Sequence, residues 1–410
     1  MAYQTTTTKT YGQRLSGSFK GIGMGVLMFI AGTVVLFWNE GNFVKTRKAL
    51  NEAESVTVKV DDVSTLNQDL NGKLIHGVST VKTDEMLTDE MFDFSVNAVK
   101  LAREVEYYQW EENEKSESRE KIGGSEETIT TYTYEKKWVS EPINSAEFKD
   151  PAYQASNKII VSVPERNKVA DNVTWGAYTL PPFIKNSVSN KCSATIELSD
   201  ATKESWTSAM NIPKPTVNYE DYYLSNEENK KEYVHVSGST VYFGENPGAP
   251  AIGDVRATIS YDAPGSDLSI IAQVQGNTFT KFVAKNGKEV YSVTNGVASE
   301  EQMYSGEHQT NSIITWVLRL VGLLLIVWGL KAMFNILPTL FKVLPFLGKI
   351  VGAGVGLVCW VFGFAWSLLI FAIAWLFYRP VIAVIFLAIA GLGIWFLTKK
   401  AKEKKATANN

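Results

Sequence analysis

The chain has 410 residues, of which 45% are hydrophobic, and its 40 Lys and Arg side chains nearly balance 43 Asp and Glu, for a net charge of -3. With 30 Gly, 13 Pro and two Cys, this composition excludes a collagen-like, an intrinsically disordered or a disulfide-rich secreted chain. The charge is uneven, because residues 39–312 hold 42 acidic and 27 basic side chains, a net of -15, whereas the remainder has a net charge of +12. An acidic central segment therefore lies between two basic, apolar ends.

The amino-terminal end predicts a basic segment at residues 1–20 followed by a membrane-spanning helix at residues 21–38. The second range carries no charge and, at 1.5 Å per residue, extends roughly 27 Å, close to the thickness of a hydrocarbon core. Lys9, Arg14 and Lys20 precede it, as in a signal peptide. Because no small-residue cleavage site follows and the apolar run is longer than a signal-peptide core, we predict an uncleaved signal anchor.

The carboxy-terminal end predicts three more spans. They cover residues 313–333, 350–377 and 380–398. Between the first two of these, residues 334–349 contain Pro338 and Pro345, so we expect an interfacial cytoplasmic segment there instead of a span. Residues 399–410 form a basic tail.

The short flanks of the four predicted spans give an orientation. Lys and Arg are concentrated in residues 1–20, 334–349 and 399–410, and the positive-inside rule places all three segments, with both termini, in the cytoplasm. Residues 39–312 then lie on the opposite side as an extracytoplasmic or lumenal domain. The predicted fold class is a multi-pass membrane protein with four transmembrane α-helices, one amino-terminal and three carboxy-terminal, and a large β-rich α+β domain inserted between the first and second.

Alternating apolar and polar residues predict strands throughout the central segment. We expect long strands at Val99–Tyr107 and Thr128–Val139 to pair as an antiparallel hairpin, with the charged connection Glu111–Glu127 as a tip that projects into solvent. Asn286-Gly287 is typical of a second hairpin turn, and residues 146–190 mix helix-like pieces. Further strands are expected at Val56–Val60, Leu74–Val81, Lys158–Val163, Tyr233–Phe243, Val255–Tyr261, Leu268–Gln275, Thr278–Ala284 and Glu289–Val293.

No motif in the sequence points to catalysis. His76, His235 and His308 are isolated from other ligand types at metal-binding spacing, and no H-E-x-x-H, C-x-x-C, Walker A, dinucleotide or nucleophile-elbow pattern occurs. We therefore predict no catalytic, cofactor-binding or metal-ligating residues and no nucleic-acid partner. Cys192 and Cys359 fall in the domain and in the third span, so an internal disulfide is not expected.

Two sets of glycines at four-residue spacing predict close helix packing, either within the bundle or between copies of the chain. They are Gly17, Gly21 and Gly25 near the first span, and Gly348, Gly352 and Gly356 near the third. The simpler reading is compositional, because glycine is common in membrane helices.

Three charged residues fall where the spans meet the non-cytoplasmic interface: Glu40, Arg319 and Arg379. Arg319 lies inside the second span and either extends toward the interface or pairs with Glu40. Because the spans contain no acidic residue and few polar ones, a continuous polar path for transport is not expected.

Seven short stretches, in order and spacing, resemble the transmembrane protein 43 (LUMA) family. They read NEG at 39–41, VKLAREVEYYQW at 99–110, WVSEPINSAEF at 138–148, GENP at 244–247, GDVRATISY at 253–261, NSIITWVLR at 311–319 and WLFYRP at 375–380. The resemblance implies one amino-terminal span, a large lumenal or extracytoplasmic domain, three carboxy-terminal spans and no catalytic residues. In animals it further implies an endoplasmic reticulum and inner nuclear membrane protein that organises membrane protein complexes, with lamins and emerin as partners.

Residues 146–232 and 399–405 depart from the animal pattern. The departure leaves two locations open: a bacterial member of the family, with a periplasmic domain, spans in the inner membrane and no lamin or emerin partner, or a eukaryotic member in the endoplasmic reticulum and inner nuclear membrane.

Two functional hypotheses follow. The first is a non-enzymatic integral membrane scaffold that binds other membrane proteins or further copies of itself through the domain and the helix packing. The alternative is a membrane enzyme or lipid-handling protein with a site at the outer-leaflet interface, near Glu40, Arg319 and Arg379. The lipid bilayer is a partner in both.

Overall fold

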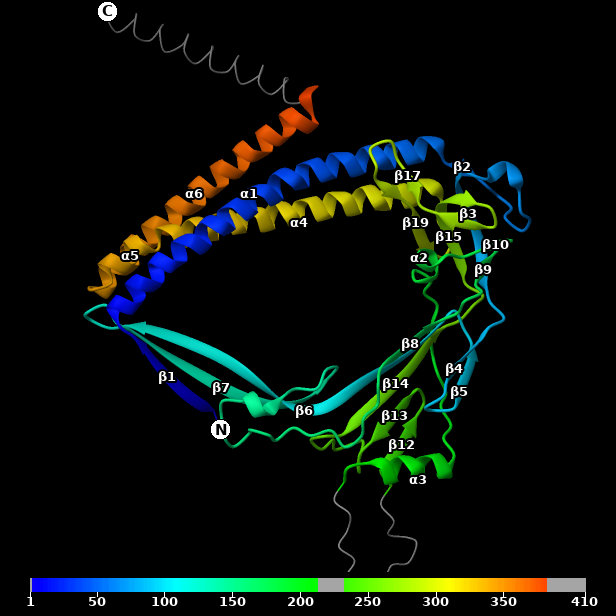
Figure 1. Ribbon diagram of the computed structural model, residues 1–410, viewed down its shortest axis with the longest axis horizontal. Helices are drawn as coiled ribbons and strands as arrows, with labels where there is room; N and C mark the ends of the chain where they lie inside the picture. Colours follow the sequence, from blue (N-terminus) through cyan, green and yellow to red (C-terminus); the bar gives the residue numbers. More distant parts are fainter. Residues whose placement is uncertain (1, 213–231, 382–410) are drawn as a thin grey trace, which may run out of the picture.

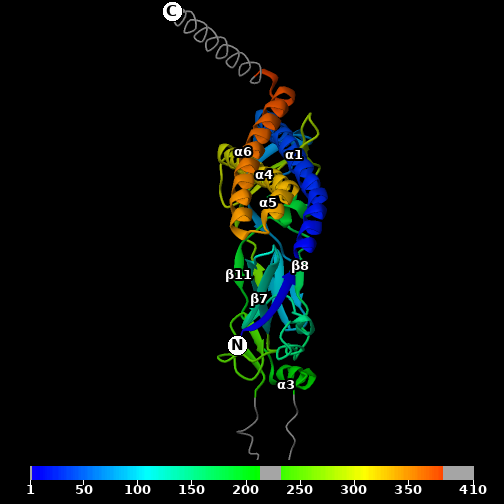
Figure 2. The ribbon, with the colours of Figure 1, turned by 90° about the vertical axis from the view of Figure 1, so that its left-hand side faces the viewer.

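In the part of the chain that the structure describes, three long helices, two large β-sheets and two separate two-stranded hairpins make up the architecture (Figure 1). The computed structural model describes residues 2–212 and 232–381. The helices lie together along one side of the molecule, the strands occupy the other sides, and a long β-ribbon returns to the far end of the helices. Figure 2 shows that the helices and the sheets form a narrow body when the molecule is turned by 90°.

The long helices are α1 (Tyr11–Val56), α4 (Glu300–Phe334) and α6 (Pro345–Tyr378), and a short helix, α5 (Ile336–Phe341), joins the last two. Each long helix is long and apolar enough to cross a membrane. The first three predicted spans fall within them. The fourth predicted span, 380–398, and the basic tail lie outside the described residues apart from Pro380 and Val381.

The helices extend well beyond the apolar windows from which they were predicted. Thr10 caps α1 in a reciprocal capping box with Gln13, and Ser299 does the same for α4 with Gln302. These caps satisfy free backbone N–H groups at the helix starts. Consequently α1 has 46 residues and α4 has 35, and the polar turns outside the apolar windows are helical too.

The first sheet has eight strands and contains the ribbon. Its order is β1-β7-β6-β14-β13-β12, with β8 added on β6 and β11 on β14. The strands are β1 (Tyr3–Lys9), β6 (Lys100–Glu120), β7 (Glu126–Val139), β8 (Arg166–Val169), β11 (Lys191–Ser193), β12 (Val234–Ser237), β13 (Thr240–Phe243) and β14 (Val255–Asp262). The ribbon consists of β1, β7 and the second half of β6, which extend beyond the rest of the sheet.

The second sheet has seven strands and lies where α1 and α4 enter the domain. Its strands are β2 (Val58–Lys59), β3 (Leu74–Lys82), β9 (Thr174–Trp175), β10 (Tyr178–Thr179), β15 (Asp267–Gln275), β16 (Thr278–Thr280) and β19 (Ser292–Asn295). Two hairpins stand apart: β4 (Met86–Asp89) with β5 (Phe94–Asn97), and β17 (Phe282–Val283) with β18 (Glu289–Val290). The remaining short helices are α2 (Pro182–Lys185), α3 (Asp200–Ala209) and the 3₁₀ turns Gln68–Leu70 and Ser145–Glu147.

One apolar core joins the two sheets. It includes Trp175, Tyr178, Phe92 and Phe243, each fully buried. A second cluster fixes the helices to the domain, because Ala49, Leu50 and Ala53 of α1 pack with Met303 and Tyr304 of α4 against Leu74 and Ile271 of the second sheet. Burial of these side chains attaches the domain-side ends of both helices to the second sheet.

Most strands predicted from alternation are confirmed, including the pair around Asn286-Gly287. The strand predicted at Lys158–Val163 is wrong, since no strand forms there; Ile160 is held by a backbone hydrogen bond to Gly253 and packs into the core. Val56 is the last residue of α1 and not the first of a strand. Core packing alone produces the apolar spacing in both places.

The connection Glu111–Glu127 was expected to be a solvent-exposed tip, and this prediction is wrong. Strand β6 continues to Glu120 and pairs with β7 as far as Glu126, which leaves only a short turn. That turn packs on the helices: Gly123 N donates to Val343 O, and the Arg14 guanidinium donates to Gly124 O at 3.0 Å. Ser and Thr pairs across the strands, such as Ser116 with Thr130 at 2.9 Å, stabilise a polar ribbon that has no apolar alternation.

The ribbon brings together segments that the charge distribution assigns to opposite sides of a bilayer. Residues 3–9 form β1, which pairs with β7 in the domain's own sheet. Lys342, in the segment between α4 and α6, forms an ion pair with Glu120 of β6. The ribbon therefore spans the distance between the domain and the amino-terminal end of α1. The whole of β6, whose first half belongs to the domain's sheet, has 21 residues and extends about 69 Å at about 3.3 Å per residue, the same length as the 46 residues of α1 at 1.5 Å.

Candidate functional site: a buried charge cluster where three helices meet

Helices α1 and α4 approach until their backbones touch, and glycines make this possible. A methyl group placed on Gly25 would lie 2.6 Å from the carbonyl oxygen of Gly329, and one on Gly32 would lie 2.8 Å from that of Gly322. No side chain fits at such distances. The antiparallel helices α1 and α4 thus meet at two glycine pairs, Gly25 with Gly329 and Gly32 with Gly322. Within each helix the two glycines are seven residues apart, and the contact fixes the register of one helix against the other.

Of the other glycines singled out from the sequence, Gly348 is also tight, because a methyl group there would lie 2.6 Å from Lys342 Cγ, and the remaining four have looser surroundings. A methyl group on Gly17 would meet no atom within 4 Å, and one on Gly21 would lie 3.7 Å from Ala332 O. Gly348, Gly352 and Gly356 face the α4–α6 connection, where the nearest atoms belong to Lys342, Pro338 and Lys331 respectively. Sequence reasoning missed Gly32, Gly322 and Gly329. The sequence did contain a signal for them: Gly25 and Gly32 are seven residues apart, and so are Gly322 and Gly329.

Glu40 is the centre of the cluster. Its carboxylate has no solvent exposure, accepts a 2.6 Å hydrogen bond from Arg319 Nε of α4, and accepts a 2.9 Å bond from Trp375 Nε1 of α6. One acidic side chain therefore bonds to both partner helices. A buried carboxylate is costly unless it is paired and hydrogen-bonded, and here each oxygen has a donor.

The two arginines of the cluster are held by aromatic rings. Arg319 lies over the ring of Trp316 at 4.7 Å and near that of Phe371 at 5.4 Å. Arg379, directly after α6, lies over Phe43 at 4.9 Å. Stacking fixes the plane of a guanidinium and leaves its N–H edge free to bond.

Between the cluster and the domain, two asparagine side chains form further hydrogen bonds between α1 and α4. Asn39 Nδ2 donates to Thr315 O at 3.0 Å, and Asn311 Nδ2 donates to Phe43 O at 3.2 Å. Next to them a methyl group on Gly41 would lie 2.5 Å from the Tyr378 ring, so α6 can approach α1 only at a glycine. Tight apolar contacts and a few polar links together join all three helices at this level.

The cluster suits a structural role better than acid–base catalysis. Both oxygens of Glu40 accept hydrogen bonds from the partner helices, so the carboxylate links α1 to α4 and α6. Within residues 2–212 and 232–381, no group of three or more His, Cys, Asp or Glu could hold a metal ion. What the arrangement does is lock α1, α4 and α6 together.

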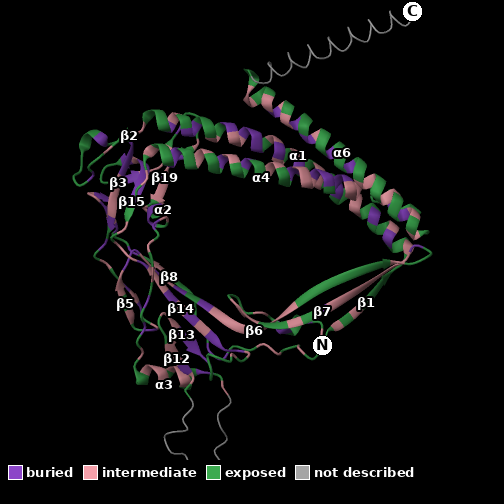
Figure 3. Cartoon of the chain, turned by 180° about the vertical axis from the view of Figure 1, so that it is seen from behind, coloured by how far each residue is buried: buried purple, intermediate pink, exposed green. Residues whose placement is uncertain are grey.

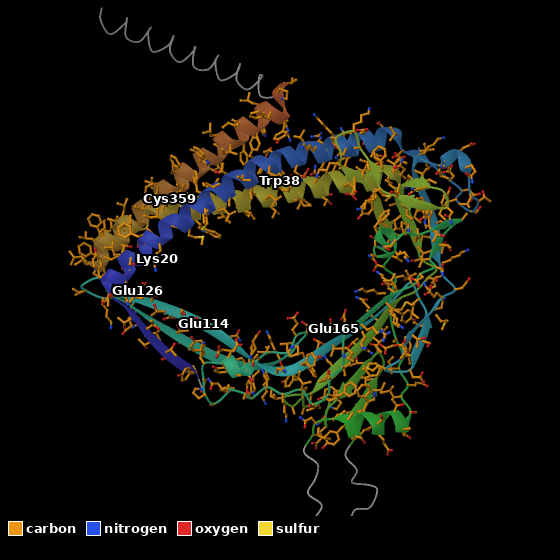
Figure 4. The ribbon with its side chains drawn as sticks, in the orientation of Figure 1. Lys20, Trp38, Glu114, Glu126, Glu165 and Cys359 are labelled. Atoms are coloured by element: carbon orange, nitrogen blue, oxygen red, sulfur yellow. The ribbon has the colours of Figure 1, made fainter. Side chains whose placement is uncertain are left out.

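A second charge cluster lies at the opposite end of the helices, where the ribbon turn docks. Arg14, 6% exposed, pairs with Glu120 at 2.8 Å, and Lys342 pairs with the same carboxylate at 3.0 Å. Desolvation alone raises the pKa of Glu120, but the hydrogen bonds from Arg14 and Lys342 and their charges outweigh it, so the pKa is lowered. Figure 4 shows Glu126 at this docking point, close to Lys20, and Glu114 further along the ribbon.

Comparison with known proteins places these features in context. The sequence profile of the family described as Transmembrane protein 43 matches residues 107–380. Transmembrane protein 43 from Homo sapiens is 29% identical over 401 residues, covering 95% of this chain and 92% of that protein, and the protein from Mus musculus is 28% identical, covering 96% and 93%. Transmembrane protein 43 homolog from Drosophila melanogaster is 28% identical and covers 91% and 93%. No solved structure matches the chain.

Proposed function

The chain belongs to the transmembrane protein 43 family, and we propose that this membrane protein is a non-enzymatic scaffold that organises membrane protein complexes. The observation that carries the proposal is the polar ribbon. It extends from the domain, which holds one end of α1, to the docking point at the other end of the same apolar helix. Where α1 crosses a bilayer, the ribbon traverses the same depth.

Lipid cannot surround such a ribbon. Its strand β1 consists largely of Thr, and the second half of β6 alternates Glu, Lys, Ser and Arg. Figure 3 shows the second half of β6 largely exposed and the facing part of β7 partly exposed where the ribbon approaches the helices. Non-helical backbone at membrane depth is tolerated only where protein buries it or where it lines a water-filled space. The ribbon therefore needs further protein around it.

The edges of the ribbon are available for that contact. Among the described strands, none pairs with the outer edge of β1, and none pairs with the free edge of β6 from Asn113 to Glu120. Open edges present unpaired N–H and C=O groups that another chain can satisfy. The partners are other membrane proteins or further copies of this chain.

The helices give the scaffold its rigidity. The domain is attached to the helices at two places. One is the apolar cluster that contains Ala49, Leu50 and Tyr304, and the other is the docking point where Arg14 pairs with Glu120. The glycine contacts and the Glu40 cluster then prevent α1, α4 and α6 from sliding. A domain fixed at both ends is suited to hold partners in place and not to open and close around a substrate.

The proposed location follows the charge distribution and the family. The four-span arrangement, cytoplasmic termini and an extracytoplasmic or lumenal domain remain part of the proposal, in a bacterial inner membrane or, in a eukaryotic host, in the endoplasmic reticulum and inner nuclear membrane.

Cross-linking in native membranes, followed by mass spectrometry, tests the scaffold role. We expect adducts heavier than the monomer that contain a second copy or a reproducible membrane protein. The matched control is the Glu120→Gln, Arg14→Gln variant, which loses ribbon docking and should lose those adducts while its domain still folds. Recovery of monomers alone from wild-type membranes would refute the scaffold.

A further inference from the structure

A basic pocket lies where α1 leaves its apolar stretch on the domain side. It has a volume of about 330 Å³. Its lining comes from α1 and from the end of α6: Val44, Arg47, Lys48, Asn51, Tyr378, Arg379, Pro380 and Val381. Cationic side chains thus converge from two helices that the Glu40 cluster holds in place.

The positive charge of the pocket is not neutralised by the protein. Within the described residues, no carboxylate lies within ion-pair distance of Arg47, Lys48 or Arg379. The nearby carboxylate of Glu40 is already paired with Arg319 at 2.6 Å. The pocket therefore retains a net charge of about +3, with Arg379 half-buried and Arg47 and Lys48 exposed, and this charge attracts an anion.

The geometry of Arg379 is suited to an anion with several oxygens. Its guanidinium lies over Phe43 at 4.9 Å and near Trp375 at 5.7 Å, so its plane is fixed. No described side chain or carbonyl accepts a hydrogen bond from it. A planar fork of free N–H groups matches a phosphate group.

The position of the pocket points to a phosphate that carries acyl chains. Trp38 is exposed near the end of the apolar run of α1, and Arg47 follows nine residues later, about 13 Å along the helix. Interfacial aromatic residues mark the headgroup level of a bilayer. Val44, Pro380 and Val381 add an apolar wall to the cationic one, and exposed Phe377 and Leu376 continue it down α6.

We propose that this pocket binds the phosphate of an anionic phospholipid, with Arg47 and Arg379 on the phosphate oxygens and the acyl chains along α6. This inference does not rest on the scaffold role, because it needs only the helices and their membrane location. Its consequence is that the headgroup links α1 to the chain that follows α6.

The test is a lipid titration of the full-length, delipidated protein in detergent, read by native mass spectrometry. Dioleoylphosphatidylglycerol is the probe and dioleoylphosphatidylcholine the neutral comparison. We expect preferential binding of the anionic lipid, and a loss of affinity of about tenfold or more in the Arg47→Gln, Arg379→Gln variant, since charge-assisted bonds are among the strong ones.

Matched controls separate the pocket from general charge effects. Lys45→Gln removes one positive charge from the exposed face of the same helix without touching the pocket lining, and it should keep wild-type affinity. Lys48→Gln, on an exposed side chain of the lining, should weaken binding without affecting folding, which guards against misfolding of the double variant.

Three results would overturn the proposal. The first is equal binding of both lipids, and the second is equal loss of affinity in Lys45→Gln and in the pocket variants. The third is displacement of the lipid by inorganic phosphate at similar concentration, which would identify a free phosphate and not a lipid as the ligand.

Discussion

The carboxylate of Glu40 and the guanidinium of Arg319 form a 2.6 Å ion pair although the two residues are 279 positions apart in the chain. Because α1 leads into the domain and α4 leads out of it, this pair joins the two helices that flank the domain in the sequence. Together with the bond from Trp375, it makes one buried carboxylate the link among three apolar helices.

The first prediction concerns this pair. Arg319→Met should lower the free energy of unfolding by about 3–5 kcal/mol, because it leaves the fully buried Glu40 charge without its cation. The measurement is denaturant or thermal unfolding in detergent. Lys20→Gln removes an exposed cation from α1 and should change stability by less than about 0.5 kcal/mol. Equal effects of the two substitutions would contradict the assignment.

The second prediction concerns the glycine contacts. Gly25→Ile should force α1 away from Gly329 and destabilise the helix pair by about 1–3 kcal/mol or more, since an added side chain has no space. Gly23→Ile is the matched control, because a methyl group there would meet nothing within 4 Å. Disulfide trapping between engineered cysteines on α1 and α4 reports the contact, and efficient trapping in both variants would argue against it.

The third prediction concerns a buried ion pair in the domain. Arg103 Nη1 bonds both oxygens of Asp89, at 2.7 and 2.9 Å, and both side chains are 2% exposed. Arg103→Ala should cost about 3–5 kcal/mol of unfolding free energy. The adjacent exposed pair of Arg166 with Glu90 should cost less than about 1 kcal/mol when Arg166 becomes Gln. Comparable losses measured by thermal unfolding would be inconsistent with this difference in burial.

The fourth prediction concerns pH and the ribbon turn. Because the folded-state pKa of Glu120 is lowered from 4.5, the docked turn binds fewer protons than the released turn. Docking is therefore strongest above pH 4.5 and weakens as the pH falls through the lower, folded-state value. The protection factors of residues 121–125 in hydrogen exchange, which correct for the intrinsic pH dependence of the exchange rate, should fall in that acidic range.

The substitution Glu120→Gln should weaken docking at neutral pH and remove most of this pH dependence. The control is Glu117→Gln, on the same strand but paired only with an exposed Lys115. A wild-type turn whose protection factors are unchanged between neutral and acidic pH would show that Glu120 does not hold it.

Much of the fold could be predicted because local patterns determine it. Eighteen uncharged residues identify the span within α1, and alternation identified β14 and β15. The end of the ribbon could not be predicted in this way. Residues such as Ser116, Glu117 and Ser118 have no alternation, and they form a strand only because β7 pairs with them.

The candidate site likewise contains residues that could be predicted from the sequence and one that could not. Glu40 and Arg319 attract attention from sequence because charge beside an apolar span is expensive, and pairing was one of two expected outcomes. Trp375 as the second donor was not foreseen, since an indole in a membrane helix is ordinary. Long-range contacts of this kind depend on how the helices pack, which the sequence does not display.

The most direct test of the scaffold is a photo-cross-linking side chain introduced at Glu117, on the exposed part of the ribbon, with Asp61 in an exposed domain loop as the comparison position. In native membranes, we expect the probe at 117 to capture protein, either a second copy or a partner, far more than the probe at 61. Capture of lipid alone, or of nothing beyond water at both positions, would contradict it.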